Sequence, residues 1–312
     1  MPRAWLTFLV LVIASTVLSA QQALFTSGID LVHLGVTVLG RDGKLVTELT
    51  ADDFELYEDG ALQEISHFSR GMASDADTMP MHLGVLLDAS GSMAEQDGIF
   101  AKTAAIKFLN TLTYAVDMTL VDFDTEVRVG RYSQDDFPRL VERIRGRRPR
   151  GWTALYDALG VYLDGAFDQD GRKVLLLYTD GSDTRSRMKF NEAMDLIRAS
   201  DVTVYAIGFL KYIPSNQRQL ERMRLQQLAE TTGGRCYFPT DVDELDEIYE
   251  QITEELEARY SLGYVSGNPR TDGAWRKIKI ALKDSRRDLG RVTVRTRQGY
   301  FAPYFETDNA VR

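Results

Sequence analysis

The chain has 312 residues, of which 44% are hydrophobic, so it can bury a sizeable core in one large domain with a smaller one, or in two domains. Its 37 basic and 46 acidic residues give a formal net charge of -9. This acidic balance argues against a nucleic-acid-binding protein, whose affinity comes largely from neutralising phosphates.

The N-terminal segment has the pattern of an export signal. Arg3 supplies positive charge, residues 5–18 are almost wholly apolar, and Ser19-Ala20 precedes a plausible cleavage point. The apolar run is short for a membrane span. We therefore predict a signal peptide over residues 1–20 and an exported chain, periplasmic or extracellular. An uncleaved N-terminal anchor that retains the protein is the alternative. No later run is long enough to span a bilayer, so we expect no membrane span in the mature chain.

Short β-like stretches follow the signal. Residues 31–38 are mostly apolar and β-branched, and Asp42-Gly43 and Asp59-Gly60 are turn signals. We predict an N-terminal β segment over residues 28–70, followed by a polar linker over 71–79.

Strand and helix patterns then alternate over residues 80–257. Strands are predicted at 83–87, 116–123, 174–179 and 202–208, with a short edge strand at 125–129 and helices at 135–145, 153–167, 190–199 and 220–229. Cys236, the single cysteine, lies in a further predicted strand and cannot form an intramolecular disulfide. This alternation predicts an α/β fold, a doubly wound, mostly parallel, Rossmann-like sheet with helices on both faces.

The pattern returns to β over residues 258–304. This C-terminal segment and the segment at 28–70 are each too small to hold a core alone. We therefore expect the two to pair into one small β-sandwich-like unit beside the α/β domain.

Polar side chains follow the first α/β strand. Asp88, Ser90 and Ser92 stand at alternate positions in the loop, where they can converge on one point. Their oxygens suit Mg²⁺, and also Mn²⁺ or Ca²⁺. A serine-rich turn before a helix, capped by Asp88 or Ser90, is the alternative interpretation. Two further pieces favour the metal site: Thr153 near a helix start and Asp180 at the end of another strand.

Together these three pieces resemble the von Willebrand factor A (VWA) domain with an intact metal-ion-dependent adhesion site. The resemblance covers residues 80–257. Both ends resemble bacterial exported proteins that carry this domain, through segments at 49–60, 260–264 and 299–303. In the family the serine and threonine positions ligate the metal directly, and the aspartates do so directly or through water. The resemblance carries these roles to a metal site formed by Asp88, Ser90, Ser92, Thr153 and Asp180.

The resemblance implies a non-enzymatic, metal-dependent protein-binding module. Mg²⁺ at the sheet edge would be completed by a carboxylate from a partner protein, since Mg²⁺ keeps exchangeable waters in open sites. A Mg²⁺-dependent hydrolase and a scaffold with a structural metal are the alternatives. The hydrolase would need a base or a second metal nearby. Asp183 is the candidate base, and an ordinary loop carboxylate is the alternative interpretation of this residue.

Three residues near Thr153 are candidates for partner contact. Trp152 replaces the small residue usual in the family, and it either packs over the loop or is exposed to a partner. Arg147 and Arg148 belong to an arginine run that is either a solvated helix end or a basic rim of the site.

Overall fold

The computed structural model describes residues 31–71, 80–94, 96–111, 115–211, 213–241 and 243–304. The predicted signal peptide lies outside these residues, as does the predicted linker apart from Gly71. The chain divides into two units, Met1–Asp30 and Leu31–Arg312, and the helices and strands named below belong to the second. In the described parts, no helix has both the length and the apolar composition needed to cross a bilayer.

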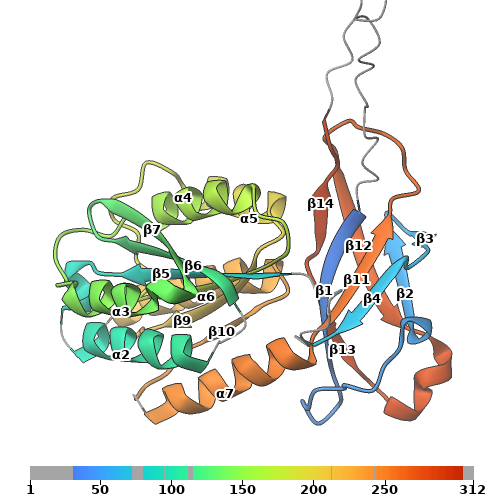
Figure 1. The fold of residues 1–312 in the computed structure, drawn as a ribbon, viewed down its shortest axis with the longest axis horizontal. Coiled ribbons are helices and arrows are strands. Elements are labelled where there is room, and N and C mark those ends of the chain that lie inside the picture. The colour runs from blue at the N-terminus through green and yellow to red at the C-terminus, as the bar shows by residue number, and fades with distance from the viewer. Residues whose placement is uncertain are drawn as a thin grey trace, which may run out of the picture. The chain divides into compact units, whose positions relative to one another are not determined.

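A six-stranded sheet forms the centre of the α/β part (Figure 1). Its strands are parallel except β7, which runs antiparallel to β6 at one edge. In spatial order they are β10 (Arg235–Tyr237), β9 (Thr203–Gly208), β8 (Arg172–Thr179), β5 (Met81–Asp88), β6 (Ala115–Phe123) and β7 (Val127–Ser133). Because helices cover both faces of β5, its sequence is a nearly continuous apolar run rather than an alternating one.

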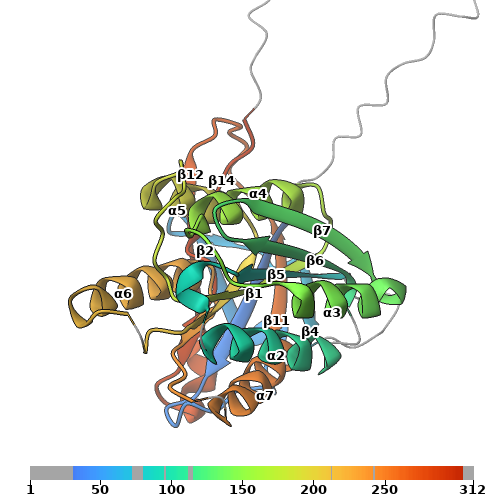
Figure 2. The same ribbon diagram turned by 90° about the vertical axis from the view of Figure 1, so that its left-hand side faces the viewer.

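Helices cover both faces of this sheet (Figures 1 and 2). One core contains side chains of α2 (Gln96–Thr111), α3 (Phe137–Gly146) and α7 (Asp243–Ala258). The other contains side chains of α4 (Leu155–Phe167), α5 (Phe190–Ala199) and α6 (Ser215–Thr231). β5 serves both cores because successive strand side chains point to opposite faces, with Leu87 in the first core and Leu86 in the second. The predicted α/β fold class is confirmed.

Several element boundaries differ from those predicted. The edge strand predicted at 125–129 is β7, which extends to Ser133. The helix predicted from Thr153 begins at Leu155, with Ala154 at its N-cap position. The helix predicted over 220–229 is longer at both ends. Short 3-10 turns, which were not predicted, lie at Ala51–Asp53, Gly91–Met93, Gln134–Asp136 and Asp284–Leu289.

Strands from both ends of the second unit form two four-stranded sheets (Figure 1). The first has the order β13 (Thr293–Arg295), β1 (Leu31–Leu39), β11 (Tyr260–Val265), β4 (His67–Arg70). The second has the order β14 (Gly299–Phe301), β12 (Trp275–Leu282), β2 (Phe54–Glu58), β3 (Ala61–Gln63). Leu34 opposite Leu262 in one sheet and Leu56 opposite Ile280 in the other contribute to one shared apolar core.

Candidate functional site

The candidate site begins where β5 ends. Asp88 is 3% exposed, and its two carboxylate oxygens accept hydrogen bonds from the Ser90 amide at 2.9 Å and the Thr179 hydroxyl at 2.7 Å. The Ser90 and Ser92 hydroxyls lie 3.0 Å apart. Ser90 makes no side-chain cap bond to the turn that it precedes. The loop therefore directs its hydroxyl groups toward each other beside the carboxylate, not toward a helix end.

Asp180 supplies a second buried carboxylate directly after β8, the strand next to β5. It is 3% exposed and accepts a hydrogen bond from the Ser182 amide at 3.1 Å. Burial, followed by the negative charge of Asp180, raises the pKa of Asp88 to about 7, although hydrogen bonds from Ser90 and Thr179 oppose this. Burial also raises the pKa of Asp180, against the hydrogen bond from Ser92. The two buried carboxylates therefore lie close enough for their negative charges to repel. A cation bound between them would offset both this repulsion and the cost of burying the charges.

Thr153 reaches the same edge of the sheet on the loop before α4. This loop is tied by backbone hydrogen bonds to the Asp88 loop, from Gly91 to Gly151 at 3.0 Å and from Arg150 to Ala89 at 2.9 Å. The Thr153 amide donates to the Thr184 hydroxyl in the loop after Asp180, at 2.9 Å. Thr153 is 3% exposed. The backbone thus links the three loops that carry the five predicted ligands.

The chemistry of these five side chains fits a hard divalent cation. Two carboxylates and three hydroxyls give an oxygen-only set, which is the kind that Mg²⁺, Mn²⁺ and Ca²⁺ prefer. The carboxylates of Asp88 and Asp180 would balance the charge of a divalent ion, and the hydroxyls add none.

A second pair of buried carboxylates, to which no role was assigned from the sequence, lies at the end of β6. Asp122 is fully buried and pairs with Arg143 at 2.7 Å and with Arg147. Asp124 pairs with Arg128 at 3.0 Å and with Arg150 at 3.4 Å. Asp122 and Asp124 flank Phe123, the last residue of β6. Residues two apart in extended backbone point to the same side, so this spacing shortly before an arginine run is the sequence feature from which the ion pairs could have been predicted.

Three arginines of the run that was interpreted as either a solvated helix end or a basic rim form these ion pairs. The Arg147 guanidinium forms an ion pair with the fully buried Asp122 while its side chain stays 24% exposed, so its charge is already neutralised by a carboxylate of the chain. Arg148, by contrast, is exposed. Most of the arginine run therefore holds the strand end and the loop before Thr153 together.

Trp152 does not pack over the loop, because it is 63% exposed. Its backbone amide donates to the Thr125 hydroxyl at 2.9 Å, which fixes the main chain while the indole faces solvent.

Asp183 accepts hydrogen bonds from the Tyr156 amide at 3.0 Å and the Ser186 hydroxyl at 2.5 Å, as a loop carboxylate does. Burial raises the pKa of the Cys236 thiol to about 12, so this thiol is a poor nucleophile.

Several known proteins are similar to this chain. An uncharacterized protein of Bacillus subtilis (strain 168), YwmC, is 28% identical over 183 residues, covering 51% of this chain and 77% of YwmC. A von Willebrand factor type A structure from Catenulispora acidiphila superposes with a TM-score of 0.48 and 14% identity, over 91% of this chain and 76% of that one. A mutant of the PilB minor pilin from Streptococcus sanguinis gives 0.46 and 14%, over 60% of this chain and 63% of the pilin.

The family itself is shown by the sequence match. Residues 82–251, more than half of the chain, match the von Willebrand factor type A domain. The matched range includes all five candidate metal ligands and most of the sheet around them. The chain therefore belongs to the von Willebrand factor type A domain family.

Proposed function

We propose that this chain is a non-enzymatic, metal-dependent protein-binding module of an exported protein. Asp88, Ser90, Ser92, Thr153 and Asp180 would hold Mg²⁺, for which Mn²⁺ or Ca²⁺ could substitute. When bound, the metal supplies an electrophilic position that a carboxylate of a partner protein can fill. The observation that carries this proposal is the pair of buried carboxylates, Asp88 and Asp180, beside serine hydroxyls at the carboxyl end of the sheet.

The chain's own residues would prepare this position before a partner arrives. The backbone bonds between the Asp88 loop and the Gly151 loop hold the ligand oxygens near one another, which lowers the ordering cost of binding. Trp152 offers a large exposed apolar surface beside Thr153, and Arg148 adds an exposed positive charge that would attract acidic surfaces. A partner with a carboxylate near an apolar patch fits this arrangement.

Metal binding is tested by unfolding and calorimetry on the wild-type chain. Mg²⁺ should raise the melting temperature relative to chelator, because a ligand at a hundredfold excess over Kd stabilises the folded state by about 2.7 kcal/mol. The Asp180→Ala variant should lose this response. Asp195→Ala, which removes an exposed helix carboxylate paired with Arg198, is the matched control and should keep it. Equal melting temperatures with metal and with chelator would refute the site.

Partner recognition is tested in two steps. The chain is first used to capture proteins from the periplasmic and extracellular fractions, and the binding kinetics of each captured protein are then measured. A true partner should bind in Mg²⁺, fail to bind in chelator, and fail to bind Asp180→Ala. Trp152→Ala should weaken the complex without changing Mg²⁺ affinity, and Arg148→Gln should slow association at low salt. A partner that binds equally well in chelator would instead favour a scaffold whose metal, if any, is structural.

Export is the remaining part of the proposal, and it rests on the sequence of residues 1–20. Mass determination of the protein recovered from outside the cytoplasm should give a chain that starts at Gln21. Recovery of the intact chain with the membrane would favour the uncleaved anchor, and recovery in the cytoplasm would exclude export.

A further inference from the structure

A groove with a volume of about 690 Å³ runs along one face of α4, starting beside the loops of the candidate metal site. The α4 residues that line it are spaced by three or four positions, which places them on one helical face. They are Ala154, Asp157, Gly160, Val161 and Asp164. The groove therefore follows the helix axis away from the metal site.

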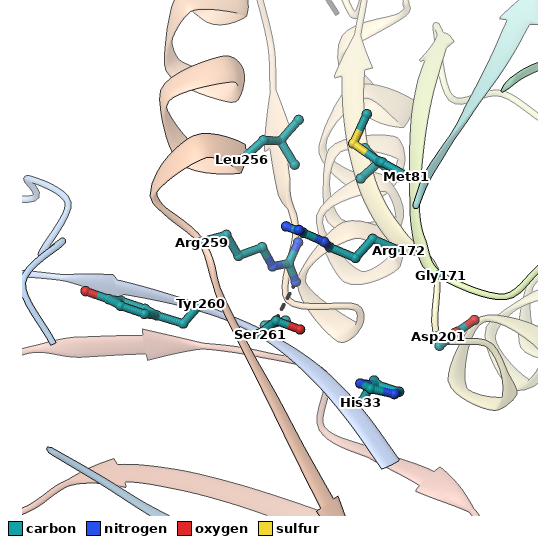
Figure 3. A pocket seen from close by; sticks show the side chains of 11 residues that line it. His33, Met81, Gly171, Arg172, Asp201, Leu256, Arg259, Tyr260 and Ser261 are labelled. Carbon is teal, nitrogen blue, oxygen red and sulfur yellow. Dashed lines mark hydrogen bonds between the residues drawn. The ribbon is translucent and has the colours of Figure 1, made fainter. Parts of the chain in front are cut away.

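The size of this α4 groove fits a segment of another protein chain. A helix rises about 1.5 Å per residue, so the stripe from Ala154 to Asp164 is about 15 Å long. An extended chain covers about 3.3 Å per residue, so about five residues of a partner would span the groove. By contrast, the cavity in Figure 3, which Arg172, Arg259 and Ser261 help to line, has a volume of about 60 Å³. A buried water requires about 10–15 Å³, so that cavity has room for a few waters and not for a peptide segment.

The α4 groove is continuous with the loops that carry the candidate ligands. The Thr153 carbonyl accepts hydrogen bonds from the Thr184 and Arg185 amides, both at 2.9 Å, and Arg185 lines the groove. Thr125, whose hydroxyl accepts from the Trp152 amide, lines it as well. A partner segment that reaches the metal position could therefore continue into the groove along the same surface.

Two exposed arginines, Arg185 and Arg187, line the α4 groove near its metal end. Within the described residues, neither guanidinium forms an ion pair or a hydrogen bond with another group of the chain. Their backbone is nevertheless fixed, because the Arg187 amide donates to both carboxylate oxygens of Asp157, at 3.2 and 3.0 Å. These amide bonds engage the Asp157 carboxylate, whereas the two guanidinium groups stay available to a partner. Both would favour a carboxylate.

The middle and the far end of the α4 groove have a different character. Val161 is 42% exposed. Met188 lies against the helix where Gly160 has no side chain, since a Cβ atom there would lie 2.7 Å from the Met188 methyl carbon. The exposed carboxylate of Asp164 lies one turn further along α4. An acidic side chain thus fits the metal end, an apolar one fits the middle, and a second carboxylate at the far end would be repelled.

We propose that the α4 groove binds an extended segment of the partner protein that carries two acidic residues followed by an apolar one. The first carboxylate fills the open position of the metal, the second pairs with Arg185 or Arg187, and the apolar side chain packs over Val161 and Met188. This partner chemistry rests on the proposed function, because the metal fixes the place of the first carboxylate. It narrows the partner from any protein with an exposed carboxylate to one with this short pattern.

The test uses a phage-displayed library of random peptides, long enough to span the groove, selected on the full chain in Mg²⁺. Selected peptides are synthesised, and their affinities are measured by fluorescence anisotropy in Mg²⁺ and in chelator. We expect Mg²⁺-dependent peptides with two acidic positions followed by an apolar one. Arg185→Gln/Arg187→Gln should weaken their binding about tenfold, because charge-assisted hydrogen bonds are lost. Arg139→Gln, which removes an exposed helix arginine paired with Asp136, is the matched control and should bind like wild type.

A change of specificity separates recognition by the two arginines from a structural role. Each selected peptide is also made with Lys in place of its second acidic residue. Wild type should prefer the original peptide, and Arg185→Glu/Arg187→Glu should prefer the Lys version, because the charges on both sides are exchanged. A variant that has merely lost its fold would bind both versions equally poorly, and circular dichroism identifies that case.

Failure of the groove can be told apart from failure of the metal site. Mg²⁺-dependent peptides that have one acidic position only, or that bind Arg185→Gln/Arg187→Gln as tightly as wild type, would overturn the groove and leave the metal-dependent module standing. If no selected peptide needs Mg²⁺, the groove proposal is overturned as well. The melting temperatures of wild type in Mg²⁺ and in chelator then show whether the metal site also fails.

Discussion

Two pairs of buried aspartates at one edge of the sheet show how neighbouring groups decide what a carboxylate does. The neighbours of Asp88 and Asp180 are hydroxyl groups and the other carboxylate of the pair, so within the described residues no cationic side chain balances their charge. Asp122 and Asp124 lie among arginines, so their charge is neutralised internally. The first pair is suited to a metal ion, whereas the second holds the loops that position it.

The Asp122 cluster should therefore be a large contributor to stability. Asp122→Asn leaves Arg143 and Arg147 next to a neutral group in a buried place, and breaking a buried ion pair in this way costs about 3–5 kcal/mol. Urea unfolding followed by circular dichroism measures this loss. Asp136→Asn, which breaks an exposed pair with Arg139, should cost less than about 1 kcal/mol. Similar losses for the two variants would contradict the structural role of Asp122.

At the scale of elements, prediction from the sequence succeeded best where periodicity was strong. The strand containing Leu86 and Leu87 and the helix at 190–199 were found because apolar runs and spacings were clear. The first turns of α6, from Ser215, are almost wholly polar and carried no such signal. Pro214 precedes this helix and marks its start, a signal that apolar periodicity does not contain.

The candidate ligands could be predicted because they follow strand ends, where loops of a parallel sheet converge. The structure brings Ser90, Ser92 and the two aspartates together, with Thr153 on the adjoining loop. The partners of the arginine run could not be predicted, because a run of like charges on one segment does not reveal which distant carboxylates it meets. The exposure of Trp152 depends on the loop conformation around Gly151, at a positive φ of 70°.

The contact between β5 and α4 depends on a single glycine. A Cβ atom at Gly84 would overlap the ring of Tyr162, whose hydroxyl oxygen would lie 2.5 Å away. Gly84→Ala should therefore push α4 from the sheet and destabilise the chain by about 1–3 kcal/mol, the usual cost of overpacking. Gly146→Ala, at a helix end with open space around it, is the control and should not destabilise. Thermal unfolding compares them, and equal midpoints would show that Tyr162 can give way freely.

At the scale of the whole second unit, strands far apart in sequence depend on each other. β1 lies between β11 and β13, and β2 pairs with β12, so these N-terminal strands have direct neighbours from the C-terminal segment. β3 reaches that segment through β2, with which it pairs. The Tyr264 and Tyr300 hydroxyls both donate to buried Glu58, at 2.6 and 2.9 Å. Composition and strand patterns indicated such a pairing, but the register of each pair is set by packing in the shared core.

This interdependence predicts how the chain behaves when it is cut between its N-terminal strands and β5. With a protease site inserted within residues 72–79, the N-terminal fragment should stay bound to the rest after cleavage, because its strands remain paired with β11, β12 and β13. The two pieces should co-elute from a sizing column in native buffer and separate in concentrated urea. A fragment with Leu34→Asp and Leu56→Asp, which places charges in the core that both sheets share, should dissociate after the same cut. Separation of the unmutated fragments in native buffer would mean that strand pairing between the two ends is too weak to hold them, and that the peptide connection at 72–79 maintains the sandwich.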